Sequence, residues 1–236
     1  MGRKVDKYHP ESDFVATQWA DLSNKYALSI DQTNTLKRYL ELLVEWNTKF
    51  NLTAITDVDA IIEYHFDDSL ALTQYVDFTT MRSVADIGTG AGFPGLPLKI
   101  LFPHLHVLLI EVNAKKRSFL AHVIKELELD NVILYPFDWR TFLRTTEHTI
   151  DYFFARASLQ PEELVRVFKP SCVSKEATLV YWASKQWTPE KIEAPFVEKE
   201  IVYTLDTVQR KFVFFKNFHK KDSLPGSPCE ENQNKG

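Results

Sequence analysis

The spacing of apolar residues divides the chain into a helical first part and a later part in which strands and helices alternate. Over residues 31–50 the apolar positions recur every three or four residues, which predicts a helix that Asp31 can cap. Residues 11–28 show a rougher version of this spacing. A short helix capped by Thr56 or Asp57 follows, and the helical pattern continues over 63–75. Residues 1–80 are therefore expected to form a helical N-terminal extension.

After Met81, short apolar runs alternate with helical patterns, which predicts an α/β fold with a mostly parallel, doubly wound sheet. The last two runs leave no space for a helix between them, so they predict a hairpin with one antiparallel strand. The domain should span 81–217, followed by a loose, polar tail over 218–236. Strands are expected at 83–87, 106–110, 131–134, 150–155, 177–183, 196–204 and 210–217, and helices at 94–102, 113–129, 139–145 and 160–169.

Composition narrows the class of protein. The chain has 236 residues, 44% of them hydrophobic, which suits one large domain or one domain with an appendage. No apolar run approaches the length of a membrane span, and the first residues lack the apolar core of a signal peptide. Cys172 and Cys229 match neither a metal-ligand spacing nor a disulfide framework. These features favour a cytoplasmic protein with no metal site.

Charge is distributed unevenly along the chain. The net charge is −4, with −6 over residues 1–80 and +2 over residues 81–236. This balance gives no strong nucleic-acid footprint, although a local basic patch can still bind RNA. A solvated helix face explains the first three cations of such a patch equally well. The candidates are Lys115, Lys116, Arg117, Lys185, Arg210, Lys211 and Lys216.

The stretch SVADIGTGAGFPG at 83–95 carries the strongest chemical signal. A strand leads into a glycine cluster and then into a helix, as in nucleotide-binding loops, where glycine lets a ligand approach the backbone. Gly90, Gly92 and Gly95 fit the dinucleotide pattern G-x-G-x-x-G. Asp86, Gly88, Gly90 and Gly92 fit D-x-G-x-G-x-G, the loop of class I S-adenosylmethionine (SAM) methyltransferases. An ordinary tight turn is the third interpretation.

One carboxylate, Asp86, helps to separate these interpretations, and a second, Glu111, supports a nucleoside site of either kind. Asp86 would repel the pyrophosphate of a dinucleotide but favour the ammonium and sulfonium groups of SAM. Glu111 ends the second expected strand and can accept hydrogen bonds from both ribose hydroxyls of either SAM or NAD, unless it is only a solvated strand-end carboxylate. The sequence therefore favours a SAM site over an NAD site.

Three further residues follow strands that end beside the expected crevice. Asp138 could accept a hydrogen bond from the adenine amino group or only cap the helix at 139–145, and Trp139 could cover the ring. Arg156 could pair with Asp86, with the cofactor carboxylate or with a substrate phosphate. A structural ion pair is the alternative for Arg156.

The motif HFDDSL at 65–70 places His65 and Ser69 on one helix face, four residues apart. Such a pair could belong to a metal site or to a catalytic triad. No nearby residue completes either set, so a structural or substrate-positioning role is favoured.

In combination, five runs resemble the bacterial 16S ribosomal RNA guanine-N7 methyltransferase family, also called glucose-inhibited division protein B. They are LVEWNTKFNLTAIT, HFDDSLAL, VADIGTGAGFPGLPL, KKRSFLAHVIKELELDNV and FARA, in this order between about residues 25 and 217. The resemblance implies a class I SAM-dependent methyltransferase fold with a helical N-terminal extension. It also implies SAM as the cofactor and a guanine N7 of 16S rRNA, free or in the 30S ribosomal subunit, as the acceptor.

The resemblance implies particular contacts as well. Those to the cofactor come from Gly88, Phe93, Glu111, the Trp139–Arg140 pair and Arg156. Lys185 and Arg210 fall at basic positions of the family, and RNA contacts are expected from them together with Lys115, Lys116 and Arg117. The chain departs from the family pattern S-R-x-E-E at residues 137–141, which read FDWRT, and from a lysine-glycine pair at Lys185-Gln186.

Guanine N7 carries a lone pair and no proton at neutral pH, so methyl transfer to it needs no general base. The site must align N7, the methyl carbon and the sulfur, with Asp86 and Arg156 as electrostatic or positioning groups. Phe93 and Trp139 are candidates to stack on a base. Three other functions stay open: methyl transfer to a small molecule, a non-catalytic SAM- or RNA-binding module for ribosome assembly, and an NAD oxidoreductase.

Overall fold

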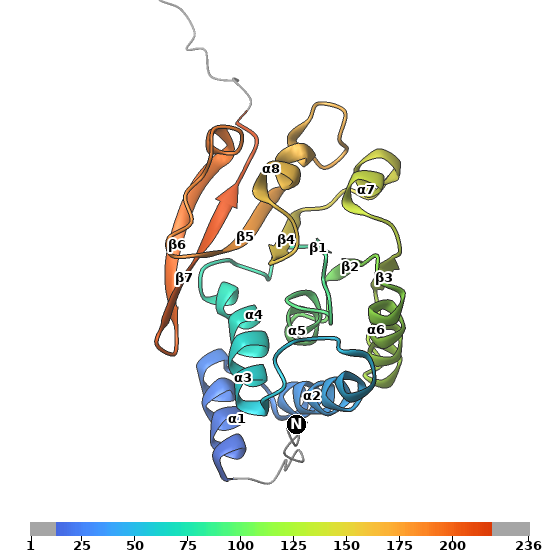
Figure 1. The fold of residues 1–236 in the computed structure, drawn as a ribbon, viewed down its shortest axis with the longest axis vertical. Helices are drawn as coiled ribbons and strands as arrows, with labels where there is room; N and C mark the ends of the chain where they lie inside the picture. The colour runs from blue at the N-terminus through green and yellow to red at the C-terminus, as the bar shows by residue number, and fades with distance from the viewer. Residues whose placement is uncertain (1–12, 219–236) are drawn as a thin grey trace, which may run out of the picture.

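Seven strands form one sheet in the order β3-β2-β1-β4-β5-β7-β6 (Figure 1). The computed structural model describes residues 13–218. Strands β1 to β5 pair in parallel, whereas β7 is antiparallel to both β5 and β6. This arrangement confirms the expected class I methyltransferase fold with its C-terminal hairpin. The strands are β1 Ser83–Ile87, β2 His106–Ile110, β3 Val132–Tyr135, β4 Tyr152–Arg156, β5 Thr178–Ser184, β6 Val197–Leu205 and β7 Val208–Phe215.

The helices between the strands differ from the expected ones mainly in length. The helix expected over 113–129 ends earlier because Glu128 takes a positive φ of 52°, a conformation that stops a helix. The helix expected over 160–169 is one α-helical turn followed by a tighter 3₁₀ turn. These elements are α5 Gly95–Leu101, α6 Ala114–Glu126, α7 Trp139–Thr145, α8 Pro161–Leu164, η3 Val165–Phe168 and η4 Ala194–Phe196.

The first part of the described chain is helical, as expected. Ser29, rather than Asp31, caps α2: its hydroxyl accepts a hydrogen bond from the Gln32 amide, and the Gln32 side chain accepts one from the Ser29 amide. Asp57 caps α3. The elements are α1 Asp13–Tyr26, α2 Ile30–Phe50, α3 Val58–Ile61, η1 Ile62–Asp67, α4 Asp68–Leu70 and η2 Ala71–Gln74. The last four follow one another directly, and η1 is a wide π-helical turn.

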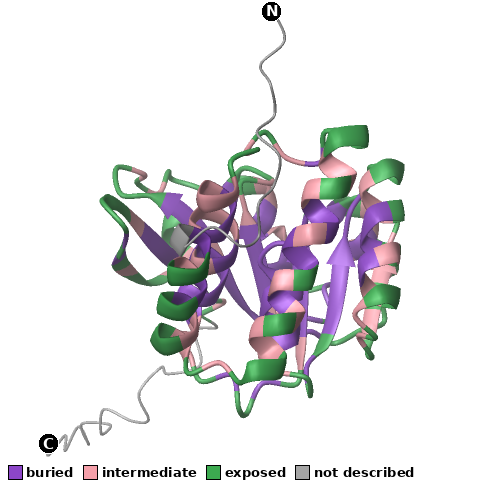
Figure 2. Ribbon diagram, turned by 90° about the horizontal axis from the view of Figure 1, so that it is seen from below, coloured by how far each residue is buried: buried purple, intermediate pink, exposed green. Residues whose placement is uncertain are grey.

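Apolar side chains form one core on each face of the sheet. Figure 2 shows buried residues along the strands and on the inward sides of the helices. The larger core includes the N-terminal helices, where the Phe66 ring makes edge contacts with Trp19, Tyr39 and Phe93 at centroid distances of 5.2–5.5 Å. The predicted N-terminal extension therefore shares a core with the sheet. The predicted tail lies, except for Phe218, outside the described residues.

No helix within residues 13–218 is both long and apolar enough to cross a bilayer.

Gly92 is expected to be the glycine of the loop that tolerates substitution least. A Cβ on Gly92 would lie 2.7 Å from Cδ1 of Leu96 and closer still to the Tyr39 hydroxyl, and its φ is +100°. Gly92→Ala should therefore lower the free energy of unfolding by about 3 kcal/mol or more, from backbone strain and overpacking together. Urea unfolding measures this loss.

The matched control is Gly90→Ala. Gly90 also has a positive φ, but the nearest atom to its added Cβ would be 3.8 Å away. It should lose only about 1–2 kcal/mol, the strain of a left-handed residue. Equal losses in the two variants would contradict the packing argument.

Candidate functional site

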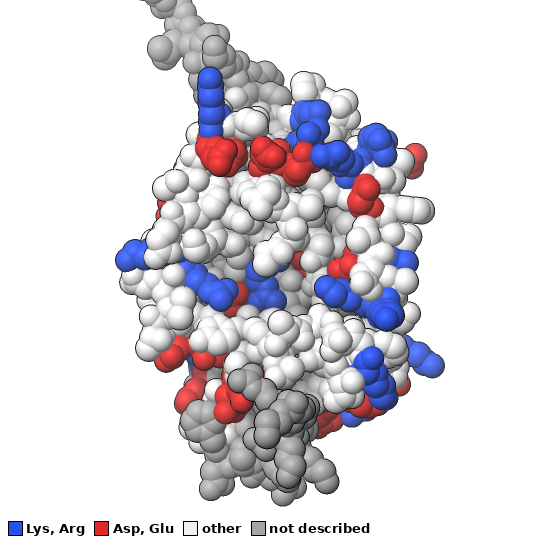
Figure 3. Space-filling model, viewed as in Figure 1, with Lys and Arg blue, Asp and Glu red and all other residues white. Residues whose placement is uncertain are grey.

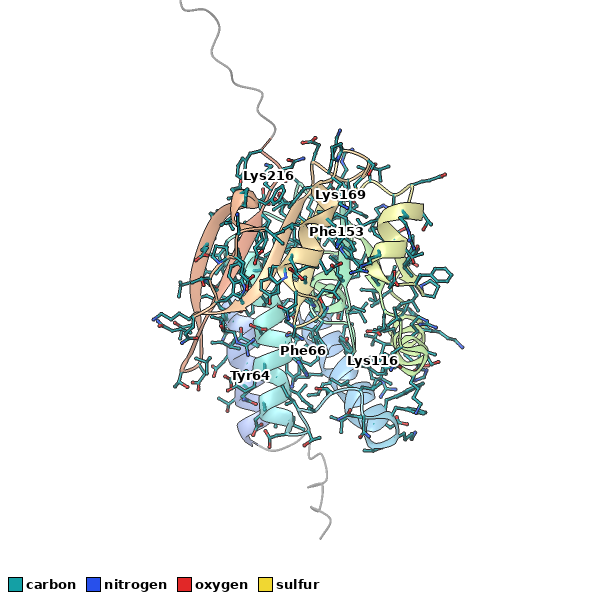
Figure 4. All side chains as sticks on the ribbon, turned by 45° about the horizontal axis from the view of Figure 1, so that its top comes forward. Tyr64, Phe66, Lys116, Phe153, Lys169 and Lys216 are labelled. Atoms are coloured by element: carbon teal, nitrogen blue, oxygen red, sulfur yellow. The ribbon has the colours of Figure 1, made fainter. Side chains whose placement is uncertain are left out.

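A cavity of about 580 Å³ lies beside the carboxyl ends of β1 and β4. The chain leaves β1 here with β2 on one side and β4 on the other, which is where doubly wound sheets bind ligands. Figure 4 shows Tyr64, on the N-terminal helical stretch, and Lys116, on α6, on opposite sides of this region. The cavity is lined by the glycine loop at 88–91, Phe93, Lys116, the helical extension at Leu52, Thr53, Ile55, Tyr64 and His65, and Arg156, Ala157, Val208 and Arg210.

The glycine loop is hydrogen-bonded to β2 on one side and open to the cavity at Gly90. The amides of Gly88 and Thr89 donate to the Ile110 carbonyl at 2.8 and 3.2 Å, which ties the loop to β2. In front of Gly90 the space is free, because an added Cβ would meet only Nζ of Lys116 at 3.8 Å and the Gly88 carbonyl at 4.0 Å. Gly90 is therefore the point where a ligand can approach the backbone.

Asp86 braces the loop and does not line the cavity. Its Oδ2 accepts hydrogen bonds from the Thr89 hydroxyl at 2.6 Å and from the Gly95 amide at 2.8 Å. Burial raises the pKa of Asp86 to about 6, opposed by these two hydrogen bonds and by the charge of Arg156. The carboxylate is thus mostly ionised at neutral pH. Its Oδ1 is buried and has no partner within the described part of the chain.

Glu111 joins the end of β2 to the glycine loop. Its side chain is buried, with Oε2 accepting from the Gly90 amide at 2.9 Å and Oε1 from the Asn113 amide at 2.8 Å. Because each carboxylate oxygen has a second lone pair, Glu111 can still accept hydrogen bonds from a ligand next to Gly90. The burial contradicts the alternative that Glu111 is a solvated strand-end residue.

One of the predicted partners of Arg156 was Asp86, but the structure shows other partners. Its guanidinium donates to the Tyr64 carbonyl at 2.9 Å and to Oδ2 of Asp68 at 3.1 Å. Arg210 donates to the same Asp68 oxygen at 3.0 Å. Asp68 is fully buried, so the second aspartate of HFDDSL is the ion-pair partner that the sequence reasoning did not identify. No local pattern marks it.

His65 is a neutral, structural side chain. Because a guanidinium can only donate, Nδ1 of His65 accepts from Arg156 at 3.3 Å, and Nε2 carries the proton that it donates to the Thr53 hydroxyl at 2.9 Å. Burial, and then the charge of Arg156, lower the pKa of His65 to about 3. Ser69 donates to the His65 carbonyl and not to its ring. Within residues 13–218 no cluster of His, Cys, Asp and Glu could hold a metal ion.

Phe93 lines the cavity, but its ring belongs to the core. The ring stacks on Tyr39 and on His65, with centroids 5.1 and 4.8 Å apart, and the Arg156 guanidinium lies 5.5 Å from its centroid. Its side chain is 4% exposed. Phe93 thus packs the helical extension against the glycine loop, and it offers no open face on which a base could stack.

The structure places the three residues at the start of α7 away from the cavity. Asp138 caps α7 by accepting from the Thr141 amide at 2.7 Å, as the capping alternative predicts. Trp139 is buried against the second core, and its indole donates to the Glu163 carbonyl at 2.9 Å. Arg140 forms an ion pair with Glu163 at 2.8 Å. Trp139 is 3% exposed and its ring packs on Phe142 and Phe153, so the predicted stacking of a base on Trp139 is wrong.

Two exposed apolar residues near the ends of β2 and β3 were not identified from the sequence. Val112 and Phe137 are 60% and 58% exposed, and they come directly after Glu111 and directly before Asp138. Large apolar side chains next to strand-end acids are the signal that could have identified them.

Five of the seven predicted basic residues fall into three groups. Lys116 lines the cavity at the glycine loop, and Lys115 is exposed beside it. Arg117 donates to the carbonyls of Glu111 at 3.0 Å and Val112 at 2.6 Å, so it holds the end of β2 instead of facing a ligand. Lys185 and Arg210 line a second cavity between β5 and the β6–β7 turn.

The two remaining basic residues, Lys211 and Lys216, do not belong to a basic patch around the cavities. Lys211 is buried and paired with Glu200 at 2.8 Å. Lys216 lies at the opposite end of the molecule from Tyr64, near Lys169 (Figure 4).

Comparisons with known proteins agree with this fold. The model of the family GidB, rRNA small subunit methyltransferase G, matches residues 32–223. A ribosomal RNA small subunit methyltransferase G of Listeria monocytogenes is 36% identical over 207 residues, which cover 87% of this chain and 82% of that protein. A putative methyltransferase of Escherichia coli has a similar fold, with a TM-score of 0.51, 14% identity and coverage of 64% of this chain and 86% of that one.

Some relatives match over a shorter stretch. The protein of the same name from Lysinibacillus sphaericus is 50% identical over 105 residues, and the match covers 44% of each chain. In a second relative, from an Exiguobacterium species, the match is 47% identical and covers 51% of the relative's length. The family model nevertheless covers most of this chain, which therefore belongs to the GidB family of rRNA small subunit methyltransferase G.

Proposed function

We propose that this protein transfers a methyl group from SAM to N7 of a guanine in 16S rRNA. The observation that carries the proposal is the open space in front of Gly90, next to the buried Glu111 carboxylate. A carboxylate at the end of β2, one glycine-loop amide away from an open crevice, suits the ribose of a nucleoside cofactor. Membership of the GidB family supports the reaction class and the RNA acceptor.

The residues present fit such a cofactor. Glu111 would accept hydrogen bonds from the ribose hydroxyls, and the free backbone at Gly90 would lie against the nucleoside. Lys116 and Arg156 line the same cavity and supply positive charge next to the loop, where an anionic group of the ligand can bind. When bound, SAM supplies a methyl group activated by the positive sulfonium.

The proposed reaction does not require any residue of the chain to transfer a proton. Guanine N7 offers its lone pair directly, and the neutral His65 is occupied by Thr53 and Arg156. The ionised Asp86 stabilises positive charge near the loop, an effect that burial strengthens. The remaining task is geometric, because in-line transfer depends on holding the acceptor within contact distance of the methyl group.

The experiment that tests the proposal is methyl transfer from labelled SAM to 30S subunits isolated from a strain that lacks the protein. The expected result is one methyl group per subunit, mapped as N7-methylguanine in 16S rRNA. Transfer to a metabolite extract but not to the subunits would overturn the RNA acceptor. Binding of NAD without binding of SAM would overturn the cofactor.

Gly90→Val should abolish SAM binding while the protein stays folded. The β-branched side chain would fill the open space in which the cofactor contacts the backbone, and the nearest protein atom to its Cβ lies 3.8 Å away. Isothermal titration with SAM, together with circular dichroism, checks both parts. A folded variant with unchanged SAM affinity would mean that the cofactor does not approach Gly90.

Glu111→Gln should weaken SAM binding by about 1–3 kcal/mol, the cost of replacing a charged acceptor by a neutral amide. S-adenosylhomocysteine should lose as much, since both ligands carry the same ribose. The matched control is Glu163→Gln, because Glu163 pairs with Arg140 and Arg166, whereas Glu111 contacts the Gly90 amide of the glycine loop. If only SAM lost affinity, Glu111 would lie near the sulfur and not near the ribose.

A further inference from the structure

A second cavity of about 760 Å³ adjoins the first. It lies between the end of β5 and the β6–β7 turn, and it shares Arg156, Ala157, Val208 and Arg210 with the cavity at the glycine loop. Ligand pockets typically measure about 300–1,000 Å³, so this one is large enough for a nucleotide. A ligand in the second cavity would meet a cofactor in the first at Arg156 and Arg210.

The second cavity favours an anionic ligand. Its lining includes Arg156, Lys185 and Arg210, and neither Asp nor Glu is among the described residues that form it. Figure 3 shows Lys and Arg side chains on both sides of the hollow in the middle of this face. In RNA the phosphates supply the negative charge, and arginine binds phosphate through its planar fork of donors.

Asp68 fixes both arginines. Its Oδ2 accepts from Arg156 at 3.1 Å and from Arg210 at 3.0 Å, and its Oδ1 accepts from the Tyr203 hydroxyl at 2.6 Å. The indole of Trp182 donates to its backbone carbonyl at 3.1 Å. These partners come from β4, β5, β6 and β7, so one buried carboxylate holds the hairpin and the end of β4 in a fixed relation.

The charges of this group do not cancel. Two guanidiniums face one carboxylate, and His65, which contacts Arg156, is neutral. The side chains of Arg156 and Arg210 are 13% and 31% exposed, whereas Asp68 is fully buried. Both guanidiniums are partly exposed at the junction of the cavities, and the further acidic groups that interact with them are Glu63 for Arg210 and the buried Asp86 for Arg156.

We infer that Asp68 is a positioning residue that aims Arg156 and Arg210 at a phosphate of the acceptor nucleotide in the second cavity. The inference rests on the proposed function, since it assigns the second cavity to the methyl acceptor. Asp68 does not touch the substrate. It acts through the two arginines, whose guanidiniums it keeps at the boundary between cofactor and acceptor.

The experiment measures how much a phosphate adds to binding. Guanosine and guanosine 3′,5′-bisphosphate are titrated separately into the full chain saturated with S-adenosylhomocysteine. The wild type should bind the bisphosphate at least about tenfold more tightly, the scale of one charged hydrogen-bond pair. Asp68→Asn should reduce this preference to about threefold or less, because the arginines lose their anchor, while guanosine itself binds as before.

The matched control is Tyr203→Phe, which removes a hydrogen bond from the other oxygen of the same carboxylate and leaves both arginine contacts in place. This variant should unfold at a lower temperature and keep the phosphate preference. If Asp68 were only structural, Asp68→Asn and Tyr203→Phe would behave alike, which would overturn the inference.

A double-mutant cycle tests whether Asp68 acts through Arg210. Added to Arg210→Gln, the Asp68→Asn change should weaken bisphosphate binding by less than about twofold, whereas independent effects would multiply. The single variant Arg210→Gln should also lose the phosphate preference. Because Arg210 is partly exposed, this variant is expected to fold, so it tests the inference even if Asp68→Asn does not fold.

Two outcomes would overturn the inference directly. An equal affinity of the wild type for guanosine and its bisphosphate would mean that the second cavity holds no phosphate. Tighter bisphosphate binding by Asp68→Asn would mean that net charge matters and positioning does not. Because these titrations need no turnover, failure of methyl transfer to 30S subunits would overturn the proposed function without changing the result for Asp68.

Discussion

The glycine loop keeps its shape because the N-terminal helices press against it. The Tyr39 hydroxyl of α2 donates to the Ala91 carbonyl in the middle of the loop, and the Tyr39 ring stacks on Phe93 at the end of the loop. Only glycine fits at position 92, where a Cβ would meet Tyr39 and Leu96. The loop is therefore shaped from two sides, by α2 and by the strand-end carboxylates of Asp86 and Glu111. The helical extension is part of the site, and removing it would expose the loop and a large share of the core.

Burying charge at this site carries a cost that the geometry must offset. Desolvating an aspartate costs several kcal/mol unless partners satisfy it, and a buried ion pair often contributes little net stability. Asp68 nevertheless holds two guanidiniums, a tyrosine hydroxyl and, through its carbonyl, an indole. Such an arrangement fixes orientation more than it stabilises the fold. The π-helical turn η1 next to Asp68 is consistent with this view, since such turns occur frequently at functional sites.

The sequence predicts the fold well because its signals are local. The fold class follows from the apolar runs, the glycine cluster and the absence of a helix between β6 and β7. Glu111 lies at the end of β2, as predicted. Predictions failed where one local pattern fits two environments. Trp139 faces the core and not the cavity, whereas Asp138 takes the capping role that was one of its two predicted alternatives. The contacts of Asp68 could not be predicted from the sequence. Arg156 lies 88 positions and Arg210 lies 142 positions further along the chain, and no periodicity links segments so far apart.

The proposed methyl transfer to guanine N7 involves no proton transfer, so it would require the protein to place the two ligands accurately and not to supply a reactive side chain. No described side chain in either cavity has to gain or lose a proton in this reaction, and the neutral His65 connects Thr53 with Arg156 and stacks on Phe93. Rate then depends on the distance and angle between two bound ligands, where an error of about 1 Å can cost a hundredfold. The residues that set this distance lie on separate elements: the glycine loop holds one ligand region, and the hairpin with Arg210 holds the other. Asp68 is the buried group that joins the helical stretch to both β4 and the hairpin, so in the proposed mechanism the relative placement of the two ligands depends on a residue that lines neither cavity.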